Sequence, residues 1–139
     1  MIRKLQLKDA SQVALLIKQL TPNIVEPDNL VKRLEGLING DNFKYFVAED
    51  NNEVIGFAGL AWYHIPSKGL IAWVEEVVVD EKVRSKGIGK ALMNKLLELA
   101  QELKCNRVKL TVKNPIAIEL YKKLGFEITD SKVMIKKNY

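Results

Sequence analysis

The chain has 139 residues, which is enough for one hydrophobic core and therefore one domain, and its 47% hydrophobic and 28% charged residues are ordinary for a globular protein. Its net charge of +5 favours anionic partners, but basic residues stand together in pairs at most, which argues against nucleic acid. No apolar run reaches the roughly 20 residues of a membrane helix, and the N-terminus lacks the apolar core of a signal peptide. Cys105 is the only cysteine, which excludes an internal disulfide. We therefore expect a cytoplasmic protein with no membrane partner.

The N-terminal third predicts one strand and two helices. Residues 2–7 are expected to form the strand. Asp9 followed by Gln12 resembles a capping box, and the apolar spacing after it continues as a helix. Asp28 is expected to cap a second, shorter helix, which the polar residues 39–42 end.

The middle of the chain changes from a helical to a strand period. Strands are predicted over residues 45–49, 54–62 and 70–80, and tight turns over residues 50–52 and 66–69 join them. Three consecutive strands with short turns are typical of an antiparallel meander.

The C-terminal half alternates between helix and strand. Regularly spaced apolar residues from Ile88 onward predict a helix of about four turns, and a strand follows over residues 107–113. The order strand, helix, strand implies a parallel pair. A last helix begins after Asn114, and Gly125 ends it.

Two short strands, over residues 126–129 and 132–136, are expected to complete the sheet. The predicted fold class is α/β, with a mixed, largely antiparallel sheet (α+β) flanked by helices on both faces. Residues 1–139 are predicted to form a single domain.

Two glycines, Gly87 and Gly89, occupy the junction between the long strand and the helix that follows it. A helix start offers unpaired N–H groups and a partial positive charge, and Arg84, Lys86 and Lys90 surround this one. The combination favours an anion, with phosphate or pyrophosphate as the best match. The alternative is a turn that only packs the helix on the strand.

Two blocks of the sequence resemble the GNAT superfamily of acetyl-CoA-dependent N-acetyltransferases. Residues 79–92 contain Arg84-Ser85-Lys86-Gly87-Ile88-Gly89, which matches the family signature R/Q-x-x-G-x-G/A. Residues 114–126 match the family block N-x-x-A-x-x-L-Y-x-x-x-G-F, and the two blocks have the family's order and spacing. The resemblance implies the GNAT acyltransferase fold and acetyl-CoA as cosubstrate.

The resemblance also implies which residues contact acetyl-CoA. The backbone groups of Val77 and Val79 would pair with the pantetheine arm, and the side-chain amide of Asn114 would bind the cofactor. An Asn-Pro pair is also common at a helix start for structural reasons. The residues implied to bind the pyrophosphate through the backbone are Arg84, Ser85, Lys86, Gly87, Ile88, Gly89 and Lys90.

Acetylation of an amine needs a base for the amine's proton and an acid for the leaving thiolate of CoA. Tyr121 stands at the family's general-acid position, where it would contact the cofactor sulfur; a buried packing tyrosine is the alternative. Glu75 is predicted to act as the base or to position a water, and Glu76 to hold a cationic amine; a salt bridge to a lysine is the alternative for either. Neighbours in a strand face opposite sides, so only one faces the cleft unless a bulge intervenes.

The remaining candidates are weaker. His64 is expected on the surface, with a substrate or proton-relay role as the alternative, and Trp62 and Trp73 are expected in the core rather than in the acceptor site. No His, Cys and carboxylate cluster has metal-ligand spacing, so we expect no metal. Four acidic residues favour a cationic acceptor over an acidic one: Glu75, Glu76, Glu26 and Asp28.

These features predict an N-acetyltransferase that transfers acetyl from acetyl-CoA directly to a primary amine, on a small molecule, a protein lysine or an N-terminus. The alternative is a non-catalytic acyl-CoA-binding module. The partners expected are the amine acceptor and a second copy of the chain in a homodimer, which relatives form through strand edges near the C-terminus; no nucleic acid is expected.

Overall fold

A five-stranded sheet, in the order β1-β2-β3-β4-β5, organises the part of the chain that the computed structural model describes, residues 1–21 and 27–138. The strands are β1 (Ile2–Lys4), β2 (Phe43–Asp50), β3 (Glu53–Ile65), β4 (Gly69–Val79) and β5 (Arg107–Lys109). The helices are α1 (Ala10–Leu20), α2 (Pro27–Ile38), α3 (Ile88–Glu102) and α4 (Pro115–Lys123), with the 3-10 turns η1 (Leu7–Asp9) and η2 (Glu81–Val83).

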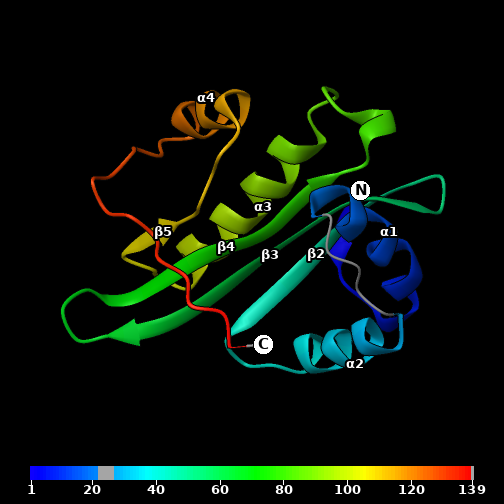
Figure 1. The fold of residues 1–139 in the computed structure, drawn as a ribbon, viewed down its shortest axis with the longest axis horizontal. Helices are drawn as coiled ribbons and strands as arrows, with labels where there is room; N and C mark the ends of the chain where they lie inside the picture. The colour runs from blue at the N-terminus through cyan, green and yellow to red at the C-terminus, as the bar shows by residue number, and fades with distance from the viewer. Residues whose placement is uncertain (22–26, 139) are drawn as a thin grey trace.

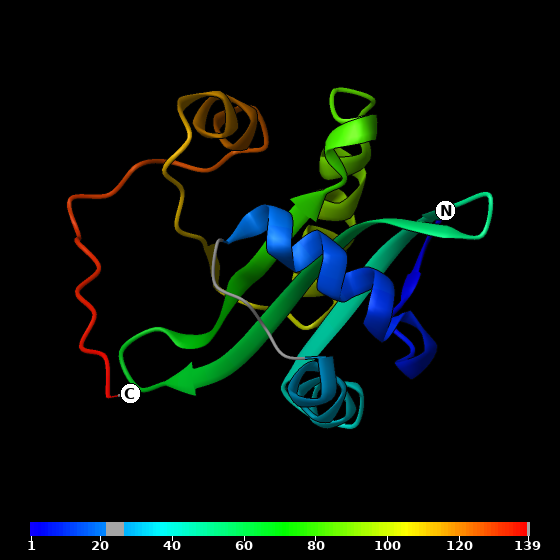
Figure 2. The same cartoon turned by 45° about the vertical axis from the view of Figure 1, so that its right-hand side comes forward.

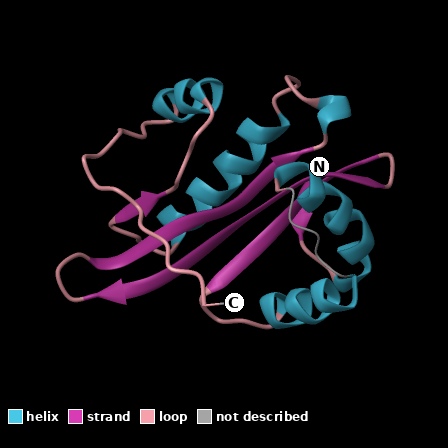
Figure 3. Cartoon of the chain, viewed as in Figure 1, coloured by secondary structure: helices cyan, strands magenta, loops and turns pink. Residues whose placement is uncertain are grey.

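The strands β1 to β4 pair antiparallel, and β4 and β5 pair parallel (Figure 1). In Figure 2, α1 crosses in front of the sheet and α3 stands behind it. Colouring by secondary structure shows the long meander of β2, β3 and β4 between these helices (Figure 3). The predicted class, a mixed and largely antiparallel sheet with helices on both faces, is confirmed, and so are the predicted meander and parallel pair.

Each face of the sheet is closed by its own hydrophobic cluster. The α1/α2 face takes Val47, Phe57 and Val78 from the strands, and the α3 face takes Phe46 and Ala58. Neighbouring residues fall in different clusters because successive side chains of a strand point to opposite sides. The helices contribute Val13, Leu16, Ile17, Leu30 and Leu34 to the first cluster and Leu92, Met93, Leu96 and Ala100 to the second.

The spacing of α3 from the sheet depends on Gly56 in β3. A Cβ atom at this position would lie 2.9 Å from Leu92 Cδ1 and 3.2 Å from Ile88 Cγ2. The missing side chain therefore lets the first turns of α3 lie close to the sheet, next to the end of β4.

An ion-pair cluster ties the first strand to the start of α1. Arg3 donates two hydrogen bonds to the Asp9 carboxylate, at 2.9 and 2.8 Å, and its Nε donates a third to Glu49 Oε2 at 2.9 Å. Asp9 is 2% exposed. Arg3 thus neutralises a carboxylate that is buried at the junction of β1, α1 and β2.

The predicted capping box at the start of α1 is wrong. The Asp9 carboxylate accepts a hydrogen bond from the backbone N–H of Gln6, and the Gln12 side chain accepts one from the N–H of Val54 in β3. The Asp9 carboxylate thus takes part in a capping box with Gln6 at the preceding turn η1, and only Gln12 has a partner far away in the sequence. Asp28, predicted as a cap, lies inside α2.

The end of the chain departs furthest from the sequence prediction. β5 ends at Lys109 instead of residue 113, and the strands predicted over 126–129 and 132–136 are not formed. An alternating apolar pattern becomes a strand only where a neighbouring strand offers hydrogen bonds, and the short β5 offers none at this position. Figure 2 shows this segment running apart from the sheet.

Candidate active site

A bulge interrupts β4 at the predicted catalytic pair. Glu75 pairs with Gly59 and Val78 pairs with Phe57. Between these two pairs β3 has one residue, Ala58, whereas β4 has two, Glu76 and Val77. Glu76 has a φ of +51°, in the left-handed region that residues with side chains seldom adopt. Two residues opposite one define a β-bulge. Strand alternation therefore no longer sends the two glutamates to opposite faces.

The two carboxylates influence each other. Burial raises the pKa of Glu75. Burial also raises the pKa of Glu76, the charge of Glu75 adds to that rise, and the charge of Arg33 in α2 opposes it. Both side chains keep exposed surface, so a substrate can reach them. The alternative reading, a salt bridge to a lysine, is not formed by either glutamate among the described residues, whose ion pairs are Arg3–Asp9, Arg3–Glu49 and Lys122–Glu119.

The strands β4 and β5 separate next to this bulge. β5 pairs with residues 71–73 of β4, while β4 continues to Val79. In the described part of the chain no strand pairs with residues 74–79 on the β5 side, which leaves backbone groups open to a ligand. The side chains of Val77 and Val79 pack against the α3 cluster, so the valines serve the core without using this free edge.

The turn after β4 has the backbone that its glycine pattern predicts. Ser85 and Gly87 have φ values of +67° and +82°. Gly87 is the N-cap residue of α3 and its carbonyl accepts the N–H of Ala91, so the N–H groups of the first helical turn face outward beyond the helix start. Arg84 Nε donates a hydrogen bond to Val79 O at 3.2 Å, which holds a cation beside the free edge.

Tyr121 lies on α4, near a turn that the sequence predicts correctly. Gly125 has a φ of +98°, and the N–H of Phe126 donates back to the carbonyl of Tyr121. This reversal brings the Phe126 ring edge-on against the Tyr121 ring, with 5.9 Å between centroids. Burial against the α3 cluster raises the pKa of Tyr121, so its phenol stays protonated at neutral pH.

Asn114 is the N-cap residue of α4. Its Oδ1 accepts a hydrogen bond from the N–H of Ile116 at 2.9 Å, and Pro115 occupies the first helical position, where its missing N–H is no loss. Asn114 and Pro115 therefore have the structural role of starting a helix. The Oδ1 atom of Asn114 is used in this role, so its side-chain nitrogen is the group that could contact a cofactor.

The sequence patterns did not indicate Tyr45, which the fold brings next to the glutamates. Tyr45 in β2 pairs with Gly59 in β3, and Gly59 pairs with Glu75 in β4, so the three form one row across the sheet. The signal that could have found it was Gly59, because a glycine inside a strand often marks the close approach of another group.

The other candidates separate by face. His64 is exposed near the end of β3, as expected. Trp62 packs against the α3 cluster, whereas Trp73 shares the face of Glu75 and donates a hydrogen bond from Nε1 to the hydroxyl of Tyr63 at 3.1 Å. Glu26 lies outside the described residues, as does the side chain of Asp28.

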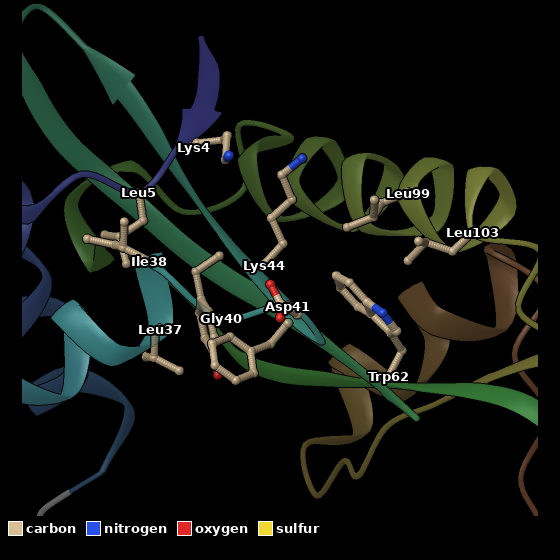
Figure 4. Close-up of a pocket in the computed structure, with 12 residues that line it drawn as sticks. Lys4, Leu5, Leu37, Ile38, Gly40, Asp41, Lys44, Trp62, Leu99 and Leu103 are labelled. Atoms are coloured by element: carbon tan, nitrogen blue, oxygen red, sulfur yellow. The ribbon is translucent and has the colours of Figure 1, made fainter. Parts of the chain in front are cut away.

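A pocket of about 260 Å³ opens beside β2, between the end of α2 and the second half of α3. Figure 4 shows Lys44 and Trp62 approaching it from the strands and Leu99 from α3. None of the residues predicted to act in catalysis or cofactor binding lines this pocket. Tyr45 is one of its lining residues, so the pocket adjoins the row that Tyr45 forms with Gly59 and Glu75.

Two further properties concern only residues 1–21 and 27–138. Their His, Cys, Asp and Glu side chains form no group of three or more that could hold a metal ion. None of their helices has the length and apolar character needed to cross a membrane.

Comparison with known proteins gives both sequence and structural relatives. An uncharacterized N-acetyltransferase of Methanocaldococcus jannaschii is 39% identical over 95 residues, which are 66% of this chain and 42% of the relative. A spermine/spermidine N(1)-acetyltransferase of Bacillus subtilis is 33% identical over 96 residues, 60% of this chain and 63% of the relative. The matched region thus spans about half the length of these relatives.

Two solved structures share the fold. Glucosamine-6-phosphate N-acetyltransferase from Arabidopsis thaliana superposes with a TM-score of 0.83 at 23% identity, covering 100% of this chain and 97% of the other. An aminoglycoside N-acetyltransferase in complex with CoA gives 0.85 at 22% identity, covering 100% and 95%. The model of the acetyltransferase (GNAT) family matches residues 13–126, and the chain belongs to that family.

Proposed function

We propose that residues 1–139 act as a single N-acetyltransferase domain that moves an acetyl group from acetyl-CoA directly to a primary amine. Membership of the GNAT family supports this reaction, and the observation that carries it is the open edge of β4, residues 74–79, which contains the two glutamates and leads into the glycine turn. The spermine/spermidine acetyltransferase among the relatives and the aminoglycoside acetyltransferase among the structures support an amine acceptor.

The residues present fit acetyl-CoA. Its pyrophosphate carries negative charge, which suits the outward N–H groups at the start of α3 and the cations of Arg84, Lys86 and Lys90. The backbone of Val77 and Val79 offers the hydrogen bonds of an unpaired strand edge to the pantetheine amides. When bound, acetyl-CoA supplies the thioester from which the acetyl group is transferred.

Substituting Gly87 by alanine should raise the KM for acetyl-CoA about tenfold. The left-handed conformation of this residue costs an alanine about 1–2 kcal/mol, and a Cβ there would meet no atom within 4 Å, so the effect is purely conformational. Steady-state kinetics and calorimetry with CoA measure it. Gly36→Ala, in α2 with open space around the added methyl, is the matched control, and an unchanged KM in Gly87→Ala would contradict the assigned turn.

The glutamates suit removal of the amine proton. A raised pKa makes the Glu75 carboxylate a stronger base than an ordinary glutamate, and we assign it to take the proton from the amine, directly or through a water. Glu76 balances the positive charge of the acceptor. This arrangement favours a cationic amine over an acidic one.

Tyr121 suits protonation of the leaving sulfur. Its Oη carries a proton at neutral pH, since a phenol ordinarily has a pKa of about 10 and burial raises the pKa of Tyr121 further. We assign Tyr121 to give this proton to the sulfur as the thioester breaks, after which solvent returns a proton to the phenolate. Direct transfer fits Cys105 as well: burial raises the pKa of this thiol, which disfavours the thiolate that a covalent acyl intermediate requires.

Substituting Glu75 by glutamine should remove the acidic limb from the pH profile of kcat/KM and lower the rate at neutral pH by about 100-fold. In the wild type the rate rises with pH as Glu75 loses its proton, and the raised pKa moves this limb above the range of an ordinary glutamate. Glu53→Gln, at the exposed start of β3, should keep the wild-type profile. A profile unchanged in Glu75→Gln, or lost in Glu76→Gln instead, would rule out Glu75 as the base.

Release of CoA thiol against a panel of amines tests the reaction itself. The panel contains polyamines, amino acids, an aminoglycoside, and peptides that offer a lysine or a free N-terminus. Turnover on one class establishes the reaction and the acceptor. CoA binding by calorimetry without turnover would instead support a non-catalytic acyl-CoA-binding module, and neither binding nor turnover would overturn the proposal.

A homodimer and a cytoplasmic location remain proposals. The dimer is supported by apolar side chains in the C-terminal segment, where Ile128, Val133, Met134 and Ile135 are 64–93% exposed. Such side chains gain free energy when a second chain covers them. Sedimentation of the full chain tests the dimer.

A further inference from the structure

The row formed by Tyr45, Gly59 and Glu75 places an aromatic residue beside the predicted base. Paired residues of antiparallel strands point to the same face, so Tyr45 and Glu75 flank Gly59 on one face of the sheet. Side chains that are two strands apart are usually too far from each other to interact. Here the residue between Tyr45 and Glu75 is Gly59, which has no side chain.

The ring of Tyr45 uses the space above Gly59. A Cβ atom on Gly59 would overlap the Tyr45 ring, with its Cε1, Cδ1 and Cζ atoms the three nearest neighbours. The ring therefore leans across β3 toward β4, and it stacks on Phe57 with 5.3 Å between centroids and 17° between planes. Gly59 is what allows the phenol to reach the glutamates.

The charges agree with this proximity. Burial raises the pKa of Tyr45 to about 12, and the charges of Glu76 and Glu75 contribute to the rise. Arg33, from α2, is the cation that acts on Glu76, and it acts more weakly than Glu75 does. The charges that act on the phenol of Tyr45 are thus the two carboxylates, whereas Arg33 acts on Glu76.

These polar groups have no partner within the described residues. No hydrogen bond or ion pair there engages the side-chain carboxylate of either glutamate or the phenol oxygen of Tyr45. Other aromatic groups of the sheet are already satisfied: the Tyr63 hydroxyl accepts from Trp73, and Lys109 Nζ lies 5.4 Å from the Trp73 ring. A ligand that donates hydrogen bonds and carries positive charge fits the two carboxylates and the phenol.

The reacting amine alone does not account for these three groups. That amine must be neutral when it attacks, so one carboxylate suffices to take its proton. A second carboxylate and a phenol oxygen beside it suit a charge that the acceptor keeps throughout the reaction.

We propose that Tyr45 is a specificity-determining residue of the acceptor site, whose oxygen accepts a hydrogen bond from a second ammonium group of a diamine or polyamine acceptor while Glu76 balances its charge. The proposal rests on the proposed acetyl transfer and names the class of acceptor.

The test compares 1,4-diaminobutane with n-butylamine, which differ by the second ammonium group. The wild type should prefer the diamine in kcat/KM. Tyr45→Phe should reduce this preference about tenfold, the size of one hydrogen bond to a charged group, with the KM for acetyl-CoA unchanged. Tyr63→Phe removes a phenol oxygen from the same face and should leave the preference intact.

Gly59→Ala tests the route by which the ring reaches the site. The added methyl should displace the ring and reduce the preference as Tyr45→Phe does, whereas Gly36→Ala should not. In a Tyr45→Ala background, Gly59→Ala should cause little further loss, because the clash has gone. Equal additive losses in both backgrounds would overturn the role of the ring.

The outcomes separate the two proposals. A wild type that acetylates both amines equally, or acetylates some other amine of the panel but not the diamine, overturns the role of Tyr45 and leaves acetyl transfer standing. A wild type that acetylates no amine overturns both. A preference for the diamine that survives Tyr45→Phe also overturns the assignment of Tyr45.

Discussion

Replacing Tyr121 by phenylalanine should lower kcat roughly 100-fold or more, the usual contribution of a positioned general acid. The phenol of Tyr121 is protonated at neutral pH, as its ordinary pKa of about 10 already requires and as burial reinforces, so the proton is available when the sulfur leaves. Phenylalanine keeps the ring and its edge-on contact with Phe126, so the variant removes the hydroxyl without a cavity. Released CoA thiol under saturating acetyl-CoA and acceptor measures kcat.

The competing explanation is a packing role on α4. If Tyr121 only filled space, kcat would stay at the wild-type value in the phenylalanine variant, and that result would remove the acid from the mechanism. Tyr63→Phe makes the same chemical change at an exposed residue and should leave kcat within about twofold. Calorimetry with CoA shows whether the Tyr121 variant still binds the cofactor.

Replacing Arg3 by alanine should lower the free energy of unfolding by about 3–5 kcal/mol at neutral pH, the cost of leaving a buried carboxylate without its partner. Asp9 is 2% exposed and receives two hydrogen bonds from the guanidinium. Urea unfolding followed by circular dichroism measures the loss. Lys8→Ala, at an exposed neighbour, should stay within about 0.5 kcal/mol of the wild type.

The loss of stability in acid should be smaller in this variant than in the wild type. Burial alone would raise the pKa of Asp9, but hydrogen bonds from Arg3 and Gln6 and the Arg3 charge lower it overall. A lowered folded pKa gives stability that is present above the unfolded value, near 3.8, and is lost as pH falls through the folded pKa. Without Arg3, its hydrogen bond and charge no longer lower the pKa of Asp9, so the difference in stability between Arg3→Ala and the wild type should shrink as the pH falls. Equal stability of Arg3→Ala and wild type would show that the ion pair is dispensable.

Local patterns predicted the elements that form from residues near in sequence. The helices around Val13 and Ile88 follow from apolar spacing, and the end of α4 follows from Gly125, whose positive φ suits glycine. The conformation of the glycine turn was predicted for the same reason, because Gly87 and the start of α3 adjoin in the chain.

Features that need distant partners could not be predicted from local patterns. The bulge at Glu76 depends on the register of β4 against β3, and the approach of Tyr45 to Glu75 depends on Gly59 between them. The side chain of Gln12 accepts a hydrogen bond from the backbone N–H of Val54 instead of capping the helix, because a buried N–H needs an acceptor.

The sequence by itself therefore determined the types of the helices and strands before Gly125, the glycine turn and the family, since these depend on residues close together in the chain. The tertiary structure decided which side chains lie beside the two glutamates and whether residues 126–136 find a strand to pair with. A side chain's contacts across a sheet depend on register and on the size of the residue between, and neither is encoded in any single stretch of sequence.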